Sequence, residues 1–311
     1  MGKTLKKFDV VLLTEQKYIN PTNVDWYTDQ VLTEDGLVLD ALEKCGLHAT
    51  KKDWSDPKFD WTTTRYAIFR TTWDYFHRFQ EFDTWLDKVA GLTKLINPID
   101  LVRWNMNKHY LLDLADKGVP IVPSIFIEQG TEQSLKEIFK KAGWENAVIK
   151  PAISGAARHT YKLNSANLRE HEQIIAQVLK FESMLIQPFL AKIETKGEVS
   201  HIVIDGKFSH SVLKKAKEGD YRVQDDWGGT VHSYKPNAAE IEFAENVARS
   251  CYPIPTYARV DLMWNDDGLL VLGELELIEP ELWFRKNPKS ADALALAIKK
   301  LISKNKANKE Q

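Results

Sequence analysis

Residues 258–276, which read ARVDLMWNDDGLLVLGELE, are the most informative stretch of the chain. Two apolar segments flank an Asp-Asp-Gly turn, a pattern typical of an antiparallel β-hairpin. Alternate residues of a strand share a face, so Glu274 and Glu276 point the same way, and Asp261 lies on the partner strand. Three carboxylates on one face repel each other, and a hard divalent cation such as Mg²⁺ would relieve that repulsion. An exposed acidic face on a half-buried strand is the alternative interpretation.

The hairpin belongs to a C-terminal part that is rich in predicted strands. These strands cover residues 184–187, 198–204, 207–214, 259–264 and 269–276. Asp205-Gly206 and Asp267-Gly268 are turn sequences between paired strands. A helix is predicted over residues 240–251, and the polar residues 304–311 are expected to fray. This pattern is typical of α+β structure.

The N-terminal part alternates strands and helices instead. Apolar runs at residues 9–14 and 66–70 predict buried parallel strands, and residues 35–44 and 79–89 have helical periodicity. The order predicts an α/β, Rossmann-like sheet, although no GxGxxG supports a dinucleotide site. After a break at Asn97-Pro98, helices are predicted over 105–117 and 135–142, and strands over 124–127 and 147–150. We therefore expect domains at residues 1–99, 100–186 and 187–311.

Composition limits the classes of function. The 311 residues carry a formal net charge of -2, with 43% hydrophobic and 28% charged residues, so nothing draws the chain to nucleic acid or an anionic membrane. Cys45 and Cys251 lie far apart, which excludes a disulfide framework and a thiolate metal site. The apolar run at residues 10–13 is too short for a signal peptide or a membrane span. A cytoplasmic protein with a small-molecule substrate, monomeric or homodimeric, is expected.

Two further segments carry chemistry. The strand AVIK ends at Lys150 and precedes the small-residue loop PAISGAARHT, so Lys150, Ser154 and Gly155 can face phosphate. A solvated lysine at a strand end is the alternative. Residues 184–190, MLIQPFL, resemble a connector between two lobes, in which Gln187, Phe189 and Leu190 would surround an adenine ring. An edge strand stopped by proline is the other interpretation.

Taken in order, these features resemble the ATP-grasp superfamily over roughly residues 100–285. The order runs through Lys108, Lys150 and its loop, the 187–190 linker, the GEVS segment at 197–200, Lys214, Arg222 and the acidic hairpin. It is most similar to the glutathione-synthetase-like and RimK-like ligases. The segments FRTTWDY (69–75), GDYRVQ (219–224) with GG (228–229), and ELELIEP (274–280) are similar to the cycloserine-biosynthesis cyclo-ligase group. The resemblance implies an ATP-grasp fold preceded by a Rossmann-like, pre-ATP-grasp domain.

The resemblance also implies a role for each residue. The ATP phosphates would contact Lys108, Lys150 and Lys214, with Ser154 and Gly155 in the covering loop. Adenine would be framed by Gln187, Phe189 and Leu190, and ribose would be bound by Glu198 or, alternatively, Glu194. The phosphorylated intermediate would be stabilised by Arg222 and Arg259, and Mg²⁺ would be held by Asp261, Glu274 and Glu276. Two ions are expected, and Mn²⁺ is an alternative metal. Many relatives carry Asn where this chain has Glu276.

The implied reaction joins a carboxylate to an amine. The substrate carboxylate attacks the γ-phosphate of ATP, and an amine then displaces phosphate from the acyl phosphate, within one substrate in a cyclo-ligase. Residues 154–159 and 215–229 are candidate lids that exclude water. A small-molecule kinase and a non-catalytic ATP-binding regulatory protein are the competing hypotheses.

The substrate is expected at the end of the strand predicted over residues 66–70. Parallel sheets bind ligands at the carboxyl ends of their strands, where Arg70, Thr72, Trp73 and Asp74 follow. Arg70 would pair with a carboxylate and Asp74 with an amine. A structural turn that contains an Arg70–Asp74 ion pair is the alternative.

Overall fold

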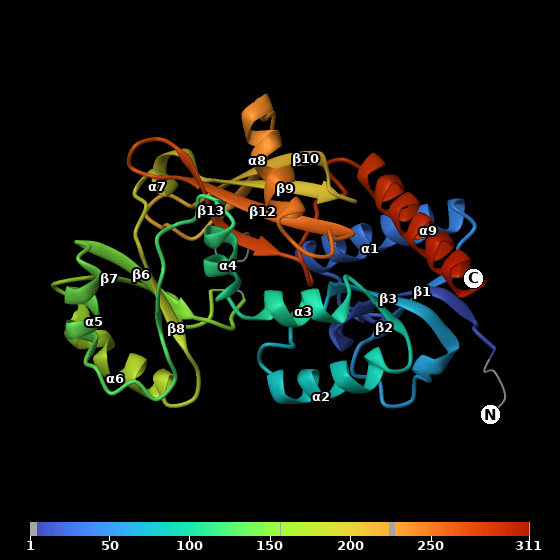
Figure 1. Cartoon of the computed structure of the whole chain (residues 1–311), viewed down its shortest axis with the longest axis horizontal. Coiled ribbons are helices and arrows are strands. Elements are labelled where there is room, and N and C mark those ends of the chain that lie inside the picture. Colours follow the sequence, from blue (N-terminus) through green and yellow to red (C-terminus); the bar gives the residue numbers. More distant parts are fainter. Residues whose placement is uncertain (1–4, 156, 224–227, 311) are drawn as a thin grey trace.

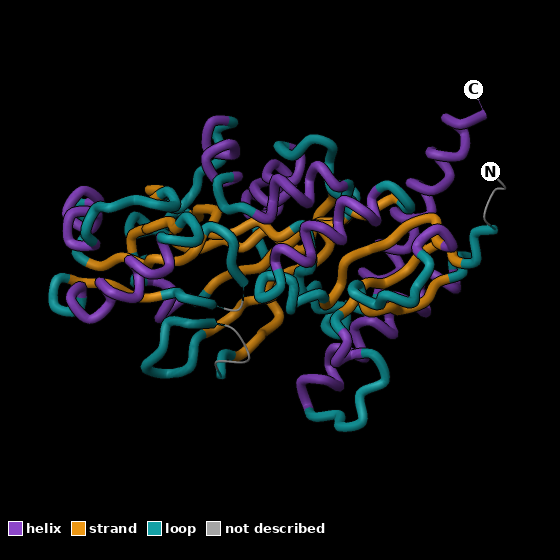
Figure 2. The backbone as a smooth tube through the Cα atoms, turned by 90° about the horizontal axis from the view of Figure 1, so that it is seen from below, coloured by secondary structure: helices purple, strands orange, loops and turns teal. Residues whose placement is uncertain are grey.

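The computed structural model describes residues 5–155, 157–223 and 228–310. Within them the strands form three sheets of four, five and four strands. Figure 2 shows these strands as a band across the molecule, with helices on both sides of it. The predicted fold class, α/β with α+β structure in the C-terminal part, is confirmed.

The N-terminal sheet is parallel, with the strand order β2-β1-β3-β4. Its strands are β1 (Phe8–Thr14), β2 (Ala49–Asp53), β3 (Thr64–Thr71) and β4 (Lys94–Ile96), and its helices are α1 (Trp26–Lys44) and α2 (Phe79–Ala90). Strand β2 was not predicted, because its sequence, ATKKD, has no apolar run. Helix α1 begins earlier than expected, since the Asp25 side chain accepts a 2.7 Å hydrogen bond from the Thr28 amide and caps it.

The C-terminal sheet is antiparallel and has the order β11-β10-β9-β12-β13. The strands are β9 (Glu198–Ile204), β10 (Lys207–Lys215), β11 (Thr230–Tyr234), β12 (Tyr257–Trp264) and β13 (Leu270–Glu276); the helices are α7 (Lys192–Lys196) and α8 (Ala238–Arg249). The predicted hairpin is confirmed as β12 and β13, in which Asp261 lies opposite Glu274 and Arg259 opposite Glu276. The Asp205-Gly206 turn has φ of 49° and 74°, as a tight hairpin requires.

The central lobe has an antiparallel sheet of its own, in the order β5-β8-β6-β7. It comprises β5 (Ile125–Ile127), β6 (Asn146–Pro151), β7 (Tyr161–Asn164), β8 (Met184–Pro188), α5 (Leu135–Ala142) and α6 (Leu168–Leu179). Both helices cover the same face of this sheet (Figure 1). They enclose a separate apolar core with side chains such as Ile149 and Ile186. Strand β8 is paired on both sides, so the edge-strand interpretation of residues 184–190 is wrong.

The single helix predicted over residues 105–117 is wrong. The structure has α3 (Ile99–Met106) and α4 (Tyr110–Asp116), with an interruption around Lys108. The Asn107 carboxamide accepts a 3.1 Å hydrogen bond from the His109 amide, and the Lys108 amide donates to the carbonyl of Ala152 at 2.9 Å. Asparagine competes with helical backbone bonds in this way, and here it separates Lys108 from both helices.

The N-terminal and C-terminal parts share one apolar core. Helix α9 (Lys289–Glu310) packs along α1 (Figure 1), and its Leu294 and Ile298 lie in the same cluster as Leu12 and Ile202. The helix runs through residues predicted to fray, so that prediction is wrong as far as Glu310, whereas Gln311 lies outside the described residues. No helix in the described ranges is long and apolar enough to cross a membrane.

Candidate active site

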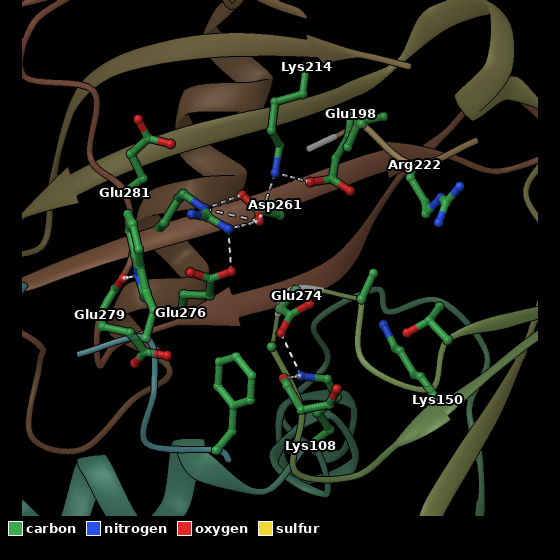
Figure 3. A pocket seen from close by; sticks show the side chains of 18 of the residues that line it. Lys108, Lys150, Glu198, Lys214, Arg222, Asp261, Glu274, Glu276, Glu279 and Glu281 are labelled. Atoms are coloured by element: carbon green, nitrogen blue, oxygen red, sulfur yellow. Dashed lines mark hydrogen bonds and ion pairs between the residues drawn. The ribbon is translucent and has the colours of Figure 1, made fainter. Parts of the chain in front are cut away.

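A cavity of about 800 Å³ lies where the N-terminal sheet, the central lobe and the C-terminal hairpin meet. Figure 3 shows Glu276, Glu279 and Glu281 on one side of it and Lys150 and Arg222 on the other. Most of the residues predicted to form a site line this cavity. They are Lys108, Lys150, Ser154, Gly155, Gln187, Phe189, Leu190, Glu198, Lys214, Arg222, Arg259, Asp261, Glu274, Glu276, Trp73 and Asp74.

Asp261 lies at the centre of a buried charge network. The Arg259 guanidinium donates to its two carboxylate oxygens, with the shortest distance 2.8 Å from Nη2, and the Lys214 ammonium lies 3.3 Å from Oδ2. The Ser200 hydroxyl donates to Oδ1 at 2.6 Å. Burial alone would raise the pKa of Asp261, but Arg259 and Lys214 hold it well below its usual range. This carboxylate is therefore charged and fixed in place.

Glu274 and Glu276 face the same cavity with different partners. The Lys108 ammonium lies 2.7 Å from Glu274 Oε1, and, although burial opposes it, Lys108 and Lys150 lower the pKa of Glu274. Glu276 also pairs with Arg259, yet burial raises its pKa to about 7, with repulsion from Asp261 and Glu274 adding to the effect. All three carboxylates of the hairpin thus line one cavity.

These carboxylates are not arranged around an empty metal position. Among the described residues, no three acidic, histidine or cysteine side chains are grouped closely enough to hold a metal ion. Lysine and arginine side chains contact them instead. The donor set nevertheless fits Mg²⁺, because it is all carboxylate oxygen in a cavity that also carries lysines suited to phosphate. Binding would require Lys108 or Arg259 to exchange a carboxylate for a nucleotide phosphate.

Lys150 lies across the cavity from Glu276 and Glu279 (Figure 3). Within the described residues its ammonium makes no hydrogen bond or ion pair, and burial lowers its pKa. The Lys150 side chain is half-buried. Partial desolvation of an ammonium without an ion-pair partner costs free energy, which an anionic ligand would recover. Lys150 lines the cavity, where it is available to an anionic ligand.

The linker residues are held in different ways. The Gln187 side chain is buried and donates to the Ser124 hydroxyl at 2.8 Å, which turns it towards β5. Leu190 packs with Val122 in a small apolar cluster at the cavity wall. The ring of Phe189 contacts the ammonium of Lys162 at 3.4 Å from its centroid. Apolar contacts from Leu190 and Phe189 therefore frame this end of the cavity.

The two candidates for ribose binding occupy different positions. Glu198 lines the cavity and forms an ion pair with Lys214, whereas Glu194 pairs with Lys162 at 3.0 Å and is not among the lining residues. The geometry therefore favours Glu198. Arg222 also lines the cavity, with its Nη2 2.7 Å from Asp220. Of the predicted lids, residues 224–227 and Ala156 lie outside the described residues.

The predicted substrate segment divides into two pairs. Trp73 and Asp74 line the cavity, but Arg70 and Thr72 are buried beneath it. Arg70 donates to the carbonyl of Pro280 at 3.4 Å and lies 4.0 Å from Asp35, so it supports the loop after β13. The structure therefore gives no support to direct substrate contact by Arg70 or Thr72.

The alternative Arg70–Asp74 ion pair is also wrong. Asp74 accepts hydrogen bonds at 2.7 Å from the Trp54 indole and from Arg78. Both of its carboxylate oxygens are thereby engaged.

Sequence reasoning missed several lining residues next to the substrate segment. Glu15 and Tyr18 follow β1, Tyr27 lies in the first turn of α1, and Glu279 and Glu281 follow β13. The rule that pointed to residues 70–75, that ligands bind where parallel strands end, applies equally to Glu15 at the end of β1. No comparable signal marks Tyr27, because its position depends on where α1 begins.

Gly155 provides a test of the loop that covers the cavity. A Cβ atom at this position would lie 2.8 Å from Cε1 of Phe76, so a side chain here would require the loop or the Phe76 ring to shift. We expect Gly155→Ala to weaken ATP binding by about tenfold, because the steric cost is roughly 1–3 kcal/mol. Titration calorimetry with ATP measures this. Phe76→Leu in the same chain should recover most of the affinity, and failure of that rescue would mean that the contact is unimportant.

Comparisons with known proteins agree with this geometry. Residues 114–277 match the RimK-like ATP-grasp domain, and residues 10–97 match the N-terminal domain of D-cycloserine synthetase DcsG. The cycloserine biosynthesis protein DcsG of Streptomyces lavendulae is 29% identical over 263 residues, which cover 79% of this chain and 86% of that protein.

Solved structures share the fold. The crystal structure of D-cycloserine synthetase DcsG superposes with a TM-score of 0.82 at 24% identity, covering 93% of this chain and 98% of that one. D-alanine–D-alanine ligase from Bacillus anthracis superposes with a TM-score of 0.64 at 16% identity, covering 94% and 96%.

The family match extends over more than half of the chain, and the predicted resemblance is confirmed. Its ATP-grasp relatives join carboxylates to amines at the expense of ATP. The chain therefore belongs to the RimK-like ATP-grasp family and is an ATP-dependent carboxylate–amine ligase.

Proposed function

We propose that this ligase activates the carboxylate of a small amino-acid-like substrate and closes a ring by joining it to an amine of the same molecule. The observation that carries the proposal is a single cavity with cations at one end and carboxylates and aromatic rings at the other. Likeness to the cycloserine biosynthesis protein, including the N-terminal domain that lines the second end, supports a small cyclised product.

The nucleotide would occupy the end that contains Lys150. Lys150 and Lys108 would neutralise the phosphates, Glu198 would accept hydrogen bonds from ribose hydroxyls, and Phe189 with Leu190 would cover adenine. The unpaired ammonium of Lys150 supports this assignment, because phosphate would supply its missing counter-charge.

The metal would be held by the hairpin. Asp261, Glu274 and Glu276 would be the ligands, for two Mg²⁺ ions as the family resemblance implies, and Mn²⁺ is the alternative. When bound, Mg²⁺ neutralises negative charge on the transferring phosphate. Occupation of the site would release Lys108 from Glu274, so that Lys108 can reach a phosphate oxygen.

The chain's own cations would position the reacting groups. Arg259 lines the cavity, held by Asp261 and Glu276, and would stabilise the charge that develops on the acyl phosphate. Arg222 and Lys214 would add to this field. No side-chain nucleophile is needed, so the chemistry depends on orientation and on exclusion of water from the acyl phosphate.

The proposed organisation follows the three predicted segments. Residues 1–99 would supply the substrate end, residues 100–186 the small lobe over the nucleotide, and residues 187–311 the metal. The continuous core between α1 and α9 supports movement of the small lobe alone. The two free cysteines support a cytoplasmic location.

An assay of ADP and phosphate release tests the proposed function. Amino acids, dipeptides and ureido compounds would be supplied with Mg²⁺ and ATP, and products identified by mass spectrometry. We expect equal amounts of ADP and free phosphate and a product lighter than its substrate by one water. A phosphorylated product without free phosphate would identify a kinase, and failure to bind ATP would contradict the assignment of the cavity.

A further inference from the structure

Trp283 has an unusual backbone conformation for a bulky residue. It lies in the loop between β13 and α9, and its φ of 48° falls in the left-handed region, where such a residue is an outlier. The side chain is buried, and among the described residues its indole N–H has no hydrogen-bond partner. Both features cost free energy of folding. Phenylalanine would pack here without the unpaired donor, so filling the core does not by itself account for tryptophan at this position.

Neighbouring segments hold the backbone of Trp283 in this conformation. The Glu34 carboxylate, which comes from α1, accepts 2.8 Å hydrogen bonds from two successive amides, the first of them that of Phe284. On the other side of Trp283, Nε2 of His210 donates to the carbonyl of Leu282 at 2.9 Å. A strained backbone persists where its surroundings fix it from several directions, and such positions concentrate at functional sites. Since Trp283 also lines the cavity, a role there is expected.

The indole ring of Trp283 contacts two cations of the charge network. The guanidinium carbon of Arg259 lies 5.2 Å from the ring centroid, and the ammonium of Lys214 lies 5.8 Å from it. Aromatic faces attract cations, tryptophan most strongly, and the attraction grows when the groups are shielded from water. The side chains of Arg259 and Lys214 are only 11% and 7% exposed. The ring therefore acts on two of the groups that are proposed to handle the phosphorylated intermediate.

The other contacts of Arg259 depend on the proposed metal site. Its guanidinium binds Asp261 and Glu276, which are two of the three proposed Mg²⁺ ligands. A divalent ion at these carboxylates would compete for the same oxygen atoms and would repel the guanidinium. The indole ring of Trp283 is uncharged and is no ligand for a hard cation. Its contact with Arg259 is therefore independent of the metal.

We propose that Trp283 is a positioning residue that holds Arg259 in place once Mg²⁺ occupies the carboxylates. This inference rests on the proposed function, in which Arg259 acts on an acyl phosphate in the metal-loaded site. In the ligand-free protein the carboxylates hold Arg259, and the ring adds to them. In the loaded protein the ring becomes the main contact. Glu34 and His210 contribute indirectly, because they fix the backbone that presents the ring.

The mobility of the Arg259 side chain tests the proposal without an activity assay. The measurement is the Nε–H signal of Arg259 in heteronuclear NMR spectra of the full chain, assigned by its loss in Arg259→Lys. Spectra are recorded with and without Mg²⁺ and a non-hydrolysable ATP analogue. A fixed guanidinium keeps its own chemical shift, whereas a mobile one moves to the shift of free arginine.

The expected result differs between the two states of the protein. In the unsubstituted chain the Arg259 signal should show a fixed guanidinium in both states. In Trp283→Leu it should stay fixed without ligand and become mobile when Mg²⁺ and the ATP analogue bind, whereas Trp283→Phe should keep most of the order. Trp283→Met replaces the leucine variant if that variant does not fold. A guanidinium that stays fixed in the loaded leucine variant, or that is mobile in the loaded unsubstituted chain, would overturn the proposal.

Turnover in the ADP-release assay provides a second readout. Trp283→Leu should lower kcat about tenfold and leave KM for ATP unchanged, and Trp283→Phe should recover most of the loss. Trp264→Leu is the matched control, because its indole lies 5.1 Å from the ammonium of Lys196 and outside the lining of the cavity. It should change neither kcat nor the Arg259 signal. If the ATP analogue fails to bind the unsubstituted chain, the proposed function is contradicted, whereas a fixed Arg259 in the loaded Trp283→Leu contradicts this inference alone.

Discussion

Glu274→Gln is expected to lower ligase turnover about a thousandfold while the protein stays folded, in line with the loss of a group that acts on the transferring phosphate. Glu274 lies opposite Asp261 in the hairpin and 2.7 Å from Lys108, so it is both a proposed metal ligand and the group that holds Lys108 before nucleotide binds. The amide keeps the size of the side chain but removes the charge that attracts a cation.

The measurement is ADP release at increasing Mg²⁺, together with thermal unfolding. If Glu274 is a metal ligand, the Mg²⁺ concentration for half-maximal activity should be higher in the variant. Glu242→Gln provides the control for loss of one carboxylate. Unchanged turnover would remove the metal role from Glu274, and unfolding of the variant would instead indicate that the Lys108 pair is structural.

Lys150→Met is expected to weaken ATP binding about 100-fold and at the same time to make the ligand-free protein more stable, by about 1 kcal/mol. The loss of ATP affinity follows from removal of the charge-assisted contact between the Lys150 ammonium and phosphate. The gain in stability follows because the half-buried ammonium is partly desolvated without an ion-pair partner among the described residues, and methionine fills a similar volume without a desolvation cost.

Opposite changes in affinity and stability separate a binding role from a structural one. Calorimetry with ATP gives the first quantity, and urea unfolding without ligand gives the second. Lys162→Met is a useful comparison, because Lys162 forms an ion pair with Glu194 and a contact with Phe189. It should lose stability slightly. Reduced stability of Lys150→Met would contradict the assignment of Lys150 as an unsatisfied charge.

The sequence was most informative where residue spacing follows backbone geometry. The β12–β13 hairpin was predictable because its alternation and Asp-Gly turn determine which residues share a face. Helix α1 was only half predicted, since its first two turns depend on a cap at Asp25 and lack a clear apolar stripe. The interruption at Lys108 could not be predicted, because its bond to Ala152 joins segments that are distant along the chain.

The site residues could likewise be predicted where local sequence spacing determines their position, and could not where contacts between distant segments do. The carboxylates of the hairpin and the strand-end Lys150 were identified from short motifs, whereas Arg70 was assigned to substrate and lies buried under Pro280. Its position in the sequence placed Arg70 at the correct edge of the sheet. It did not determine whether the side chain points into the cavity or into the protein interior. Glu279 lies three residues beyond the hairpin, where strand alternation no longer specifies direction.

The shared core of α1 and α9 has a consequence for how the protein is made. Leu12 and Val38 leave the ribosome about 260–290 residues before Leu294 and Ile298, which lie in the same core. The first sheet and α1 must therefore wait, with part of their shared apolar core uncovered, until α9 is made. Chaperones that hold nascent chains would be expected to bind this exposed apolar surface, and release would follow the emergence of α9.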